Sequence, residues 1–224
     1  MGRATVTALA EAGARVMAAA RRQERLRELA EELTAAGRTV RACVCDVTQP
    51  EVVERLIETT LAEFGKIDIL VNVAGNLRER MFFNMSEDEW DAVVDVHLKG
   101  TFTCFRAAAP IFKEQKSGTF IGFTSGAFAG SVAQANYASA KAGIVTLTRS
   151  VAAGMHRYGV TANVIAPVAK TRMSANVPFE IANMGEPEDI APMVSTTGVA
   201  VVTGRYSRHR AMTPRSWRMA APSK

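Results

Sequence analysis

The stretch Ile67-Asp68-Ile69-Leu70-Val71-Asn72-Val73-Ala74-Gly75 decides the fold class of this chain. It begins as an apolar run after Gly65 and has the length of a buried strand. Strands that are nearly continuous in apolar residues are typical of parallel sheets covered on both faces. We therefore expect helices before and after this strand.

Helical and strand patterns alternate in both directions from this stretch. Leu26, Leu29 and Leu33 recur at helical spacing, and Ser86 with Glu89 resembles a capping box that begins a long helix. The alternation predicts an α/β fold with a doubly wound parallel sheet, Rossmann-like in architecture. Expected strands cover 14–20, 39–47, 67–72, 119–123 and 160–167, and expected helices cover 2–12, 26–37, 52–64, 86–112 and 134–158.

Length and composition indicate one globular α/β domain. The chain has 224 residues, of which 48% are hydrophobic. It contains neither a run of 18 apolar residues nor a signal-peptide pattern at its start, so a cytoplasmic location without a membrane partner is expected. Cys43, Cys45 and Cys104 have the context of buried, reduced thiols, and we expect no metal site.

The net charge of +5 comes from the end of the chain. Residues 205–224 contain six of the 27 basic residues and no acid, which leaves 21 basic and 22 acidic side chains elsewhere. We expect residues 1–194 to form the folded domain and 195–224 to be a disordered basic tail. Nucleic-acid binding is not expected, because Tyr206 and Trp217 are the tail's only large stacking residues.

Tyr137 and Lys141 lie four residues apart in a segment of high helix propensity, Gln134 to Gly143. Positions i and i+4 share one face of a helix. A cation beside a phenol lowers its pKa, so Tyr137 is a candidate proton donor. The spacing alone is weak, because a solvated helix face gives the same pattern.

Polar residues follow several expected strands. Parallel strands place their carboxyl ends at one edge of the sheet, where ligands bind in open α/β folds. Each group could also be a simple turn, but together they form one expected cluster. Its members are Asp46, 72–75, Thr124, Ser125 and 167–171.

These motifs, in this order and spacing, resemble the short-chain dehydrogenase/reductase family over roughly residues 2–194. The segments 77–81, 97–102 and 130–137 are similar to 3-oxoacyl-[acyl-carrier-protein] reductases and to the 3-hydroxyacyl-CoA dehydrogenase units of multifunctional β-oxidation enzymes. The resemblance implies reversible reduction of a 3-oxoacyl group or similar ketone by a nicotinamide hydride. It also implies a homodimer or homotetramer that uses the helices at 86–113 and 134–158.

The resemblance implies roles for individual residues. Tyr137 would donate the proton, and Lys141 would lower its pKa and hold the nicotinamide ribose. The hydroxyl that binds the developing alkoxide would be Ser125, with Thr124 as the alternative at the usual family spacing. His97 falls where the family has an active-site asparagine, and a core histidine there is an equal alternative.

The expected cofactor is NADP(H), with NAD(H) as the alternative. Ala20 replaces the acid that would bind an adenosine ribose, and Arg21 and Arg22 follow it. By the same resemblance, further cofactor contacts would come from Asp46, Val47, Asn72, Ala74, Gly75, Tyr137, Lys141, Pro167 and Thr171.

The chain departs from the family pattern at both ends. The family begins with a central strand and a glycine-rich turn that cradles the pyrophosphate, and here only Gly2 matches that signature. Beyond Val194 the family's closing segment is not recognisable. A non-catalytic subunit with an assembly role is therefore the alternative function.

Overall fold

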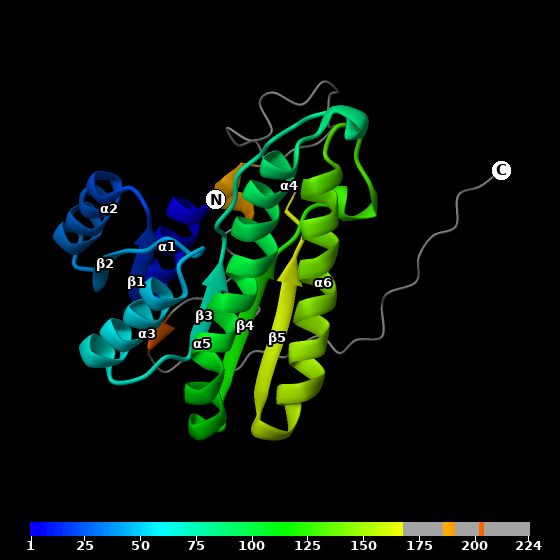
Figure 1. The fold of residues 1–224 in the computed structure, drawn as a ribbon. Coiled ribbons are helices and arrows are strands. Elements are labelled where there is room, and N and C mark those ends of the chain that lie inside the picture. The colour runs from blue at the N-terminus through cyan, green and yellow to red at the C-terminus, as the bar shows by residue number, and fades with distance from the viewer. Residues whose placement is uncertain (168–185, 191–201, 204–224) are drawn as a thin grey trace.

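The computed structural model describes residues 1–167, 186–190 and 202–203 (Figure 1). Short 3₁₀ helices cover Phe82–Asn84, Gly126–Ala129 and His156–Tyr158, and a π-helical segment covers Asp95–Lys99. The helices are α1 (Gly2–Glu11), α2 (Gln23–Ala35), α3 (Pro50–Phe64), α4 (Glu87–Val94), α5 (Gly100–Gln115) and α6 (Ala135–Met155). The strands are β1 (Arg15–Ala20), β2 (Val40–Val44), β3 (Ile69–Asn72), β4 (Gly118–Phe123), β5 (Val160–Ile165) and β6 (Val202–Thr203).

The strands form two three-stranded sheets, in the orders β2-β1-β6 and β3-β4-β5. β1 is parallel to β2, and β4 is parallel to both β3 and β5. The two-residue strand β6 pairs antiparallel with β1 and also contacts β3, so it lies where the two sheets meet (Figure 1). This is the Rossmann-like α/β architecture expected, and none of the described strands takes the place of the usual first strand in the middle of the sheet.

Two apolar cores cover the sheets. The first joins α1, β1 and α2 to side chains of the other sheet, among them Ile121, Phe123 and Ile165. The second packs α3 and α5 against β3 and β4 around Phe105, Phe112 and Phe120. Because the first core contains residues of both sheets, side-chain packing connects the two sheets.

Local sequence signals explain most element boundaries. Pro50 is the first residue of α3, and Gly65 ends that helix in the left-handed conformation at φ 76°. The capping box at Ser86 and Glu89 is confirmed, since each side chain bonds the other residue's backbone N–H. The expected strand at 39–47 is shorter, Val40–Val44, and the long helix from 86 is interrupted by the π-helical segment.

The tail expected to be disordered begins at 195 and lies outside the described residues, except for β6. Within the part of the chain that the structure describes, no helix is both long enough and apolar enough to cross a membrane.

Candidate active site

Helix α6 carries Tyr137 and Lys141 on one face. Lys141 is buried, with 5% of its surface exposed, and its Nζ lies 5.4 Å from the centre of the Tyr137 ring. The same Nζ donates a 2.7 Å hydrogen bond to the carbonyl of Phe123 at the end of β4. Burial lowers the pKa of Lys141 to about 8, so the ammonium is still mostly protonated at neutral pH.

The phenol of Tyr137 is half-buried against Ser125. Burial raises the pKa of Tyr137, and a hydrogen bond with the Ser125 side chain partly opposes that rise. The sequence-based expectation of a lowered tyrosine pKa is therefore not met in this structure. The physical reason is that desolvation of the phenolate outweighs the Ser125 hydrogen bond, while the Lys141 ammonium donates to the Phe123 carbonyl.

The hydroxyl groups of Thr124 and Ser125, the two candidates for binding the substrate oxygen, have different hydrogen-bond partners. Thr124 is buried, and its Oγ1 donates a 2.8 Å bond to the Lys141 carbonyl, so it fastens β4 to α6. Ser125 begins the 3₁₀ helix Gly126–Ala129, accepts a bond from the Ala127 N–H and is also bonded to Tyr137. Of the two hydroxyls, the one at Ser125 meets the phenol.

His97 lies in the π-helical segment and packs edge-on against Tyr137, with ring centroids 5.1 Å apart at 87°. Its Nε2 is 3.1 Å from the amide nitrogen and 2.8 Å from the carbonyl oxygen of Asn76. Nδ1 is buried and has no hydrogen-bond partner among the described residues. Burial, with the charge of Lys141, lowers the pKa of His97 to about 4, so the imidazole is neutral at pH 7.

The turn after β3 lies directly beside this histidine. A Cβ added to Gly75 would be 2.4 Å from Cε1 of His97, so only glycine fits there. Asn72 is buried, donates to the Thr101 hydroxyl at 2.8 Å and accepts from the Ala74 amide at 3.3 Å. The turn is therefore fixed between β3 and the helices that follow it.

The residues expected to contact the adenosine lie at the strand ends of the other sheet. Asp46 accepts bonds from the backbone and hydroxyl of Thr48, and the guanidinium of exposed Arg21 lies 3.9 Å from it. Burial acts to raise the pKa of Asp46, but these bonds and the Arg21 charge together lower it. Val47 packs against Gly100 at the start of α5. A Cβ added to Gly100 would lie 2.6 Å from Cγ2 of Val47.

The remaining expected residues are Arg22, Pro167 and Thr171. Arg22 is exposed at the N-cap of α2. Pro167 lies just beyond β5, which ends at Ile165 and is shorter than the strand expected over 160–167. Thr171 lies outside the described residues.

Two asparagines near the site were not predicted from the sequence. Asn136 is fully buried, donates to the carbonyls of Arg78 and Glu89, and accepts from the Tyr137 amide. Asn76 donates to the Ala92 carbonyl. The sequence signal for both asparagines was their position next to Tyr137 and Gly75. That position does not indicate where the asparagine side chains point, because the tertiary fold sets their direction.

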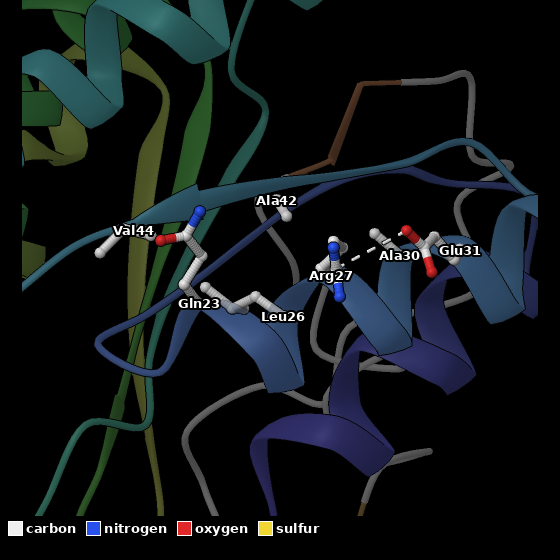
Figure 2. A pocket seen from close by; sticks show the side chains of 7 residues that line it. All are labelled: Gln23, Leu26, Arg27, Ala30, Glu31, Ala42 and Val44. Atoms are coloured by element: carbon white, nitrogen blue, oxygen red, sulfur yellow. Dashed lines mark ion pairs between the residues drawn. The ribbon is translucent and has the colours of Figure 1, made fainter.

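A hollow of about 250 Å³ lies elsewhere, between α2 and β2 (Figure 2). Leu26 and Ala30 of the helix and Ala42 and Val44 of the strand give it an apolar floor. None of the site residues above lines it.

Comparison with known proteins assigns the family. The short chain dehydrogenase family matches residues 1–180. The chain is 35% identical to 3-oxoacyl-[acyl-carrier-protein] reductase of Synechocystis over 92% of this chain and 89% of that protein. It is 42% identical to the peroxisomal hydratase-dehydrogenase-epimerase of Neurospora crassa, over 63% of this chain but only 16% of that longer protein.

Solved structures agree with this assignment. The crystal structure of gox2181 is similar with a TM-score of 0.82 and 31% identity, over 88% of this chain and 86% of that chain. The family match over most of the chain, the relatives at 35% identity or more and the shared fold lead to one conclusion: this chain belongs to the short-chain dehydrogenase/reductase family of oxidoreductases.

Proposed function

We propose that the protein interconverts a 3-oxoacyl group, or a similar ketone, and the corresponding hydroxyl group with NADP(H). The observation that carries the proposal is the joint position of Tyr137, Ser125 and Lys141 at the carboxyl ends of the strands. Relatives with the names 3-oxoacyl-[acyl-carrier-protein] reductase and hydroxyacyl-CoA dehydrogenase support this substrate class.

The chain's own side chains provide the proton and hold the oxygen. Tyr137 Oη is the proton donor to the ketone oxygen, and the Ser125 hydroxyl donates a hydrogen bond to the same oxygen as negative charge develops on it. Lys141 places a cation beside the phenol, which favours the phenolate left after proton transfer. His97 supports the Tyr137 ring from its edge and stays neutral.

The residues at the strand ends fit a nicotinamide dinucleotide. Gly75 leaves no side chain between the turn and the site, and Asn72 fixes that turn. We assign Lys141 to the nicotinamide ribose, Asp46 and Val47 to adenine, and Arg21 with Arg22 to a 2′-phosphate. Ala74, Gly75, Pro167 and Thr171 complete the proposed contacts. When bound, the nicotinamide supplies or accepts the hydride.

The direct test is reduction of acetoacetyl-CoA by the purified full chain with NADPH, followed at the absorbance of the reduced nicotinamide. We expect oxidation of NADPH that depends on the acyl substrate. A chain that neither turns over acetoacetyl-CoA nor quenches NADPH fluorescence at millimolar cofactor, yet forms dimers or tetramers, would instead be a non-catalytic subunit.

The cofactor assignment has its own test at Arg21. Arg21→Ala removes the cation from the end of β1, and a hydrogen bond to a charged group contributes about 1.5–3 kcal/mol. We expect the ratio of kcat/KM for NADPH over NADH to fall by roughly 10- to 100-fold. An unchanged ratio would place the phosphate contact elsewhere, and Arg25→Ala on the exposed side of α2 is the matched control.

Assembly and location are the last parts of the proposal. We propose a homodimer or homotetramer formed through α4, α5 and α6. Trp90 and Phe102 on α4 and α5 are exposed at 36% and 48%, which supports an interface there. The proposed location is the cytoplasm, as the composition indicated.

A further inference from the structure

Asn136 lies directly before Tyr137 in the first turn of α6, and 0% of its surface is exposed. Its Nδ2 donates to the carbonyl of Arg78 at 3.0 Å and to the carbonyl of Glu89 at 2.9 Å. Its Oδ1 accepts a 2.7 Å bond from the amide of Tyr137. Both donor hydrogens and the acceptor oxygen are used, so the orientation of the side-chain amide is fixed.

The backbone of Tyr137 depends on that side chain. α6 begins at Ala135, and the first amides of a helix have no carbonyl partner within the helix. The N-cap residue Gln134 makes no side-chain cap bond, although its carbonyl accepts from the Ala138 amide at 2.7 Å. Because Oδ1 of Asn136 accepts from the Tyr137 amide, Asn136 provides the cap that the N-cap side chain does not.

The segment 78–80, which follows β3, is bonded to the start of α6 at further points. The Arg80 amide donates a 2.8 Å bond to the carbonyl of Ala133, whose φ of 59° is left-handed. The side chain of Gln134 donates to Glu79. A non-glycine residue with left-handed φ is strained and persists only where the surrounding contacts hold it. The loop that leads into α6 is therefore fastened to the segment 78–80.

Lys141, one turn further along α6, is held by different contacts. Its Nζ donates to the carbonyl of Phe123, and its own carbonyl accepts from the hydroxyl of Thr124. Phe123 is the last residue of β4, and Thr124 follows it directly. Loss of the Asn136 amide should therefore displace Tyr137 and leave Lys141 in place.

We propose that Asn136 is a positioning residue, whose side-chain amide fixes the first turn of α6 and thereby the direction of the Tyr137 phenol. The phenol is then kept in its hydrogen bond with Ser125. Asn136 acts through the Tyr137 backbone and takes no part in the proton transfer itself. The inference rests on the proposed function, because it assigns Asn136 to the chemistry of Tyr137.

The kinetics of acetoacetyl-CoA reduction by NADPH give the first test. Asn136→Ala removes all three hydrogen bonds, and misplacement of a reacting group by about 1 Å lowers a rate roughly 100-fold. We expect kcat to fall roughly 10- to 100-fold, while the Kd for NADPH from fluorescence quenching stays within about threefold. Equal losses of kcat and of NADPH affinity would assign Asn136 to general support of the fold and overturn the proposal.

Two further variants separate position from stability. Asn136→Asp has nearly the same shape and still accepts from the Tyr137 amide, but it loses both donors, so kcat should fall as in Asn136→Ala. The matched control is Gln115→Ala, because the Gln115 amide bonds the backbone of Ile67, before β3 and at the end opposite the site. Gln115→Ala should lower the urea midpoint and keep wild-type kcat. A comparable loss of kcat in Gln115→Ala would attribute the effect to stability and overturn the proposal.

The third test reports the surroundings of the phenol without turnover. The chain has three tyrosines, Tyr137, Tyr158 and Tyr206, so labelling of tyrosine Cζ with ¹³C gives three resonances, and Tyr137→Phe assigns the one at the site. Burial raises the pKa of Tyr137 in the wild type. In Asn136→Ala this pKa should fall toward its ordinary value, because a displaced phenol regains solvent, and in Gln115→Ala it should not change. An unchanged Tyr137 titration in Asn136→Ala would overturn the proposal.

These tests distinguish failure of this inference from failure of the proposed function. If the wild-type chain does not reduce acetoacetyl-CoA, the proposed function fails, and the tyrosine titrations still decide the role of Asn136. If Asn136→Ala does not fold, hydrogen exchange of the wild type decides. The Tyr137 amide should then exchange at least about tenfold more slowly than in an unstructured peptide of the same sequence. Exchange at the peptide rate would show that Asn136 does not hold this amide and would overturn the proposal.

Discussion

At the scale of single residues, the Tyr137 hydroxyl is the group with the most specific chemical role. Tyr137→Phe keeps the ring packed against His97 and removes only the proton donor and its bond with Ser125. We expect kcat to fall by roughly 10²- to 10⁴-fold, while the free energy of unfolding changes by about 1 kcal/mol. Steady-state kinetics and urea unfolding measure the two effects.

The control for this variant is Tyr158→Phe, which changes a tyrosine outside the site at the end of the segment that follows α6. It should retain wild-type kcat. Substantial turnover by Tyr137→Phe would show that another group gives the proton, and a large loss of stability would show that the phenol mainly supports the fold.

His97 makes the stability of the protein sensitive to acid. Its folded pKa of about 4 lies below the ordinary value of 6.5, so between these pH values the unfolded chain binds a proton that the folded protein does not. The free energy of unfolding should therefore fall as pH decreases through this window, by at most about 3 kcal/mol.

The comparison of wild type with His97→Asn isolates this contribution. Urea unfolding at pH 7 and pH 4.5 should show a smaller loss of stability in the variant, because Asn does not titrate. Parallel losses in the two proteins would assign the acid sensitivity to other groups. His156→Asn, at the end of α6, is the matched histidine substitution outside the site.

At the scale of elements, the turn after β3 and the π-helical segment are built to fit each other. Gly75→Ala would place a methyl group against the His97 ring, and overpacking of this kind costs about 1–3 kcal/mol. The ring cannot move freely, because Nε2 is bonded to Asn76. We expect clear destabilisation by Gly75→Ala in the wild-type background.

A double-mutant cycle tests whether His97 causes that cost. In a His97→Ala background the methyl group has room, so Gly75→Ala should cost less by at least about 1 kcal/mol. Equal costs in both backgrounds would mean that the glycine is required by something other than the imidazole. Urea midpoints of the four proteins give the coupling free energy.

Element types were predictable, but the geometry between elements was not. Apolar runs identified β1, β3, β4 and β5 to within a few residues, and the Ser86 capping box identified the start of α4. The π-helical segment left no signal, because one extra backbone residue per turn does not alter the apolar pattern enough to be seen. The direction of Thr124 and the raised pKa of Tyr137 depend on burial, which spacing does not report.

At the scale of the whole molecule, the two sheets are connected mainly by side chains. The first core places Val16 and Ala18 of β1 with Ile121 and Phe123 of β4, whereas among the described residues β6 pairs with β1 and only contacts β3. Segments held by fewer backbone bonds open at lower free energy. The sheet of β1 and β2 should therefore open before the sheet of β3, β4 and β5.

Hydrogen exchange with mass spectrometry measures this difference. Amides of β1 and β2 should exchange at least tenfold faster than those of β4, which corresponds to about 1.4 kcal/mol of opening free energy. Ile121→Ala removes packing from the shared core and should widen the gap, while Ile57→Ala in the second core should not. Equal protection of the amides in both sheets would mean that the molecule opens as one unit. Side-chain packing would then couple the two sheets as strongly as the backbone hydrogen bonds of one continuous sheet.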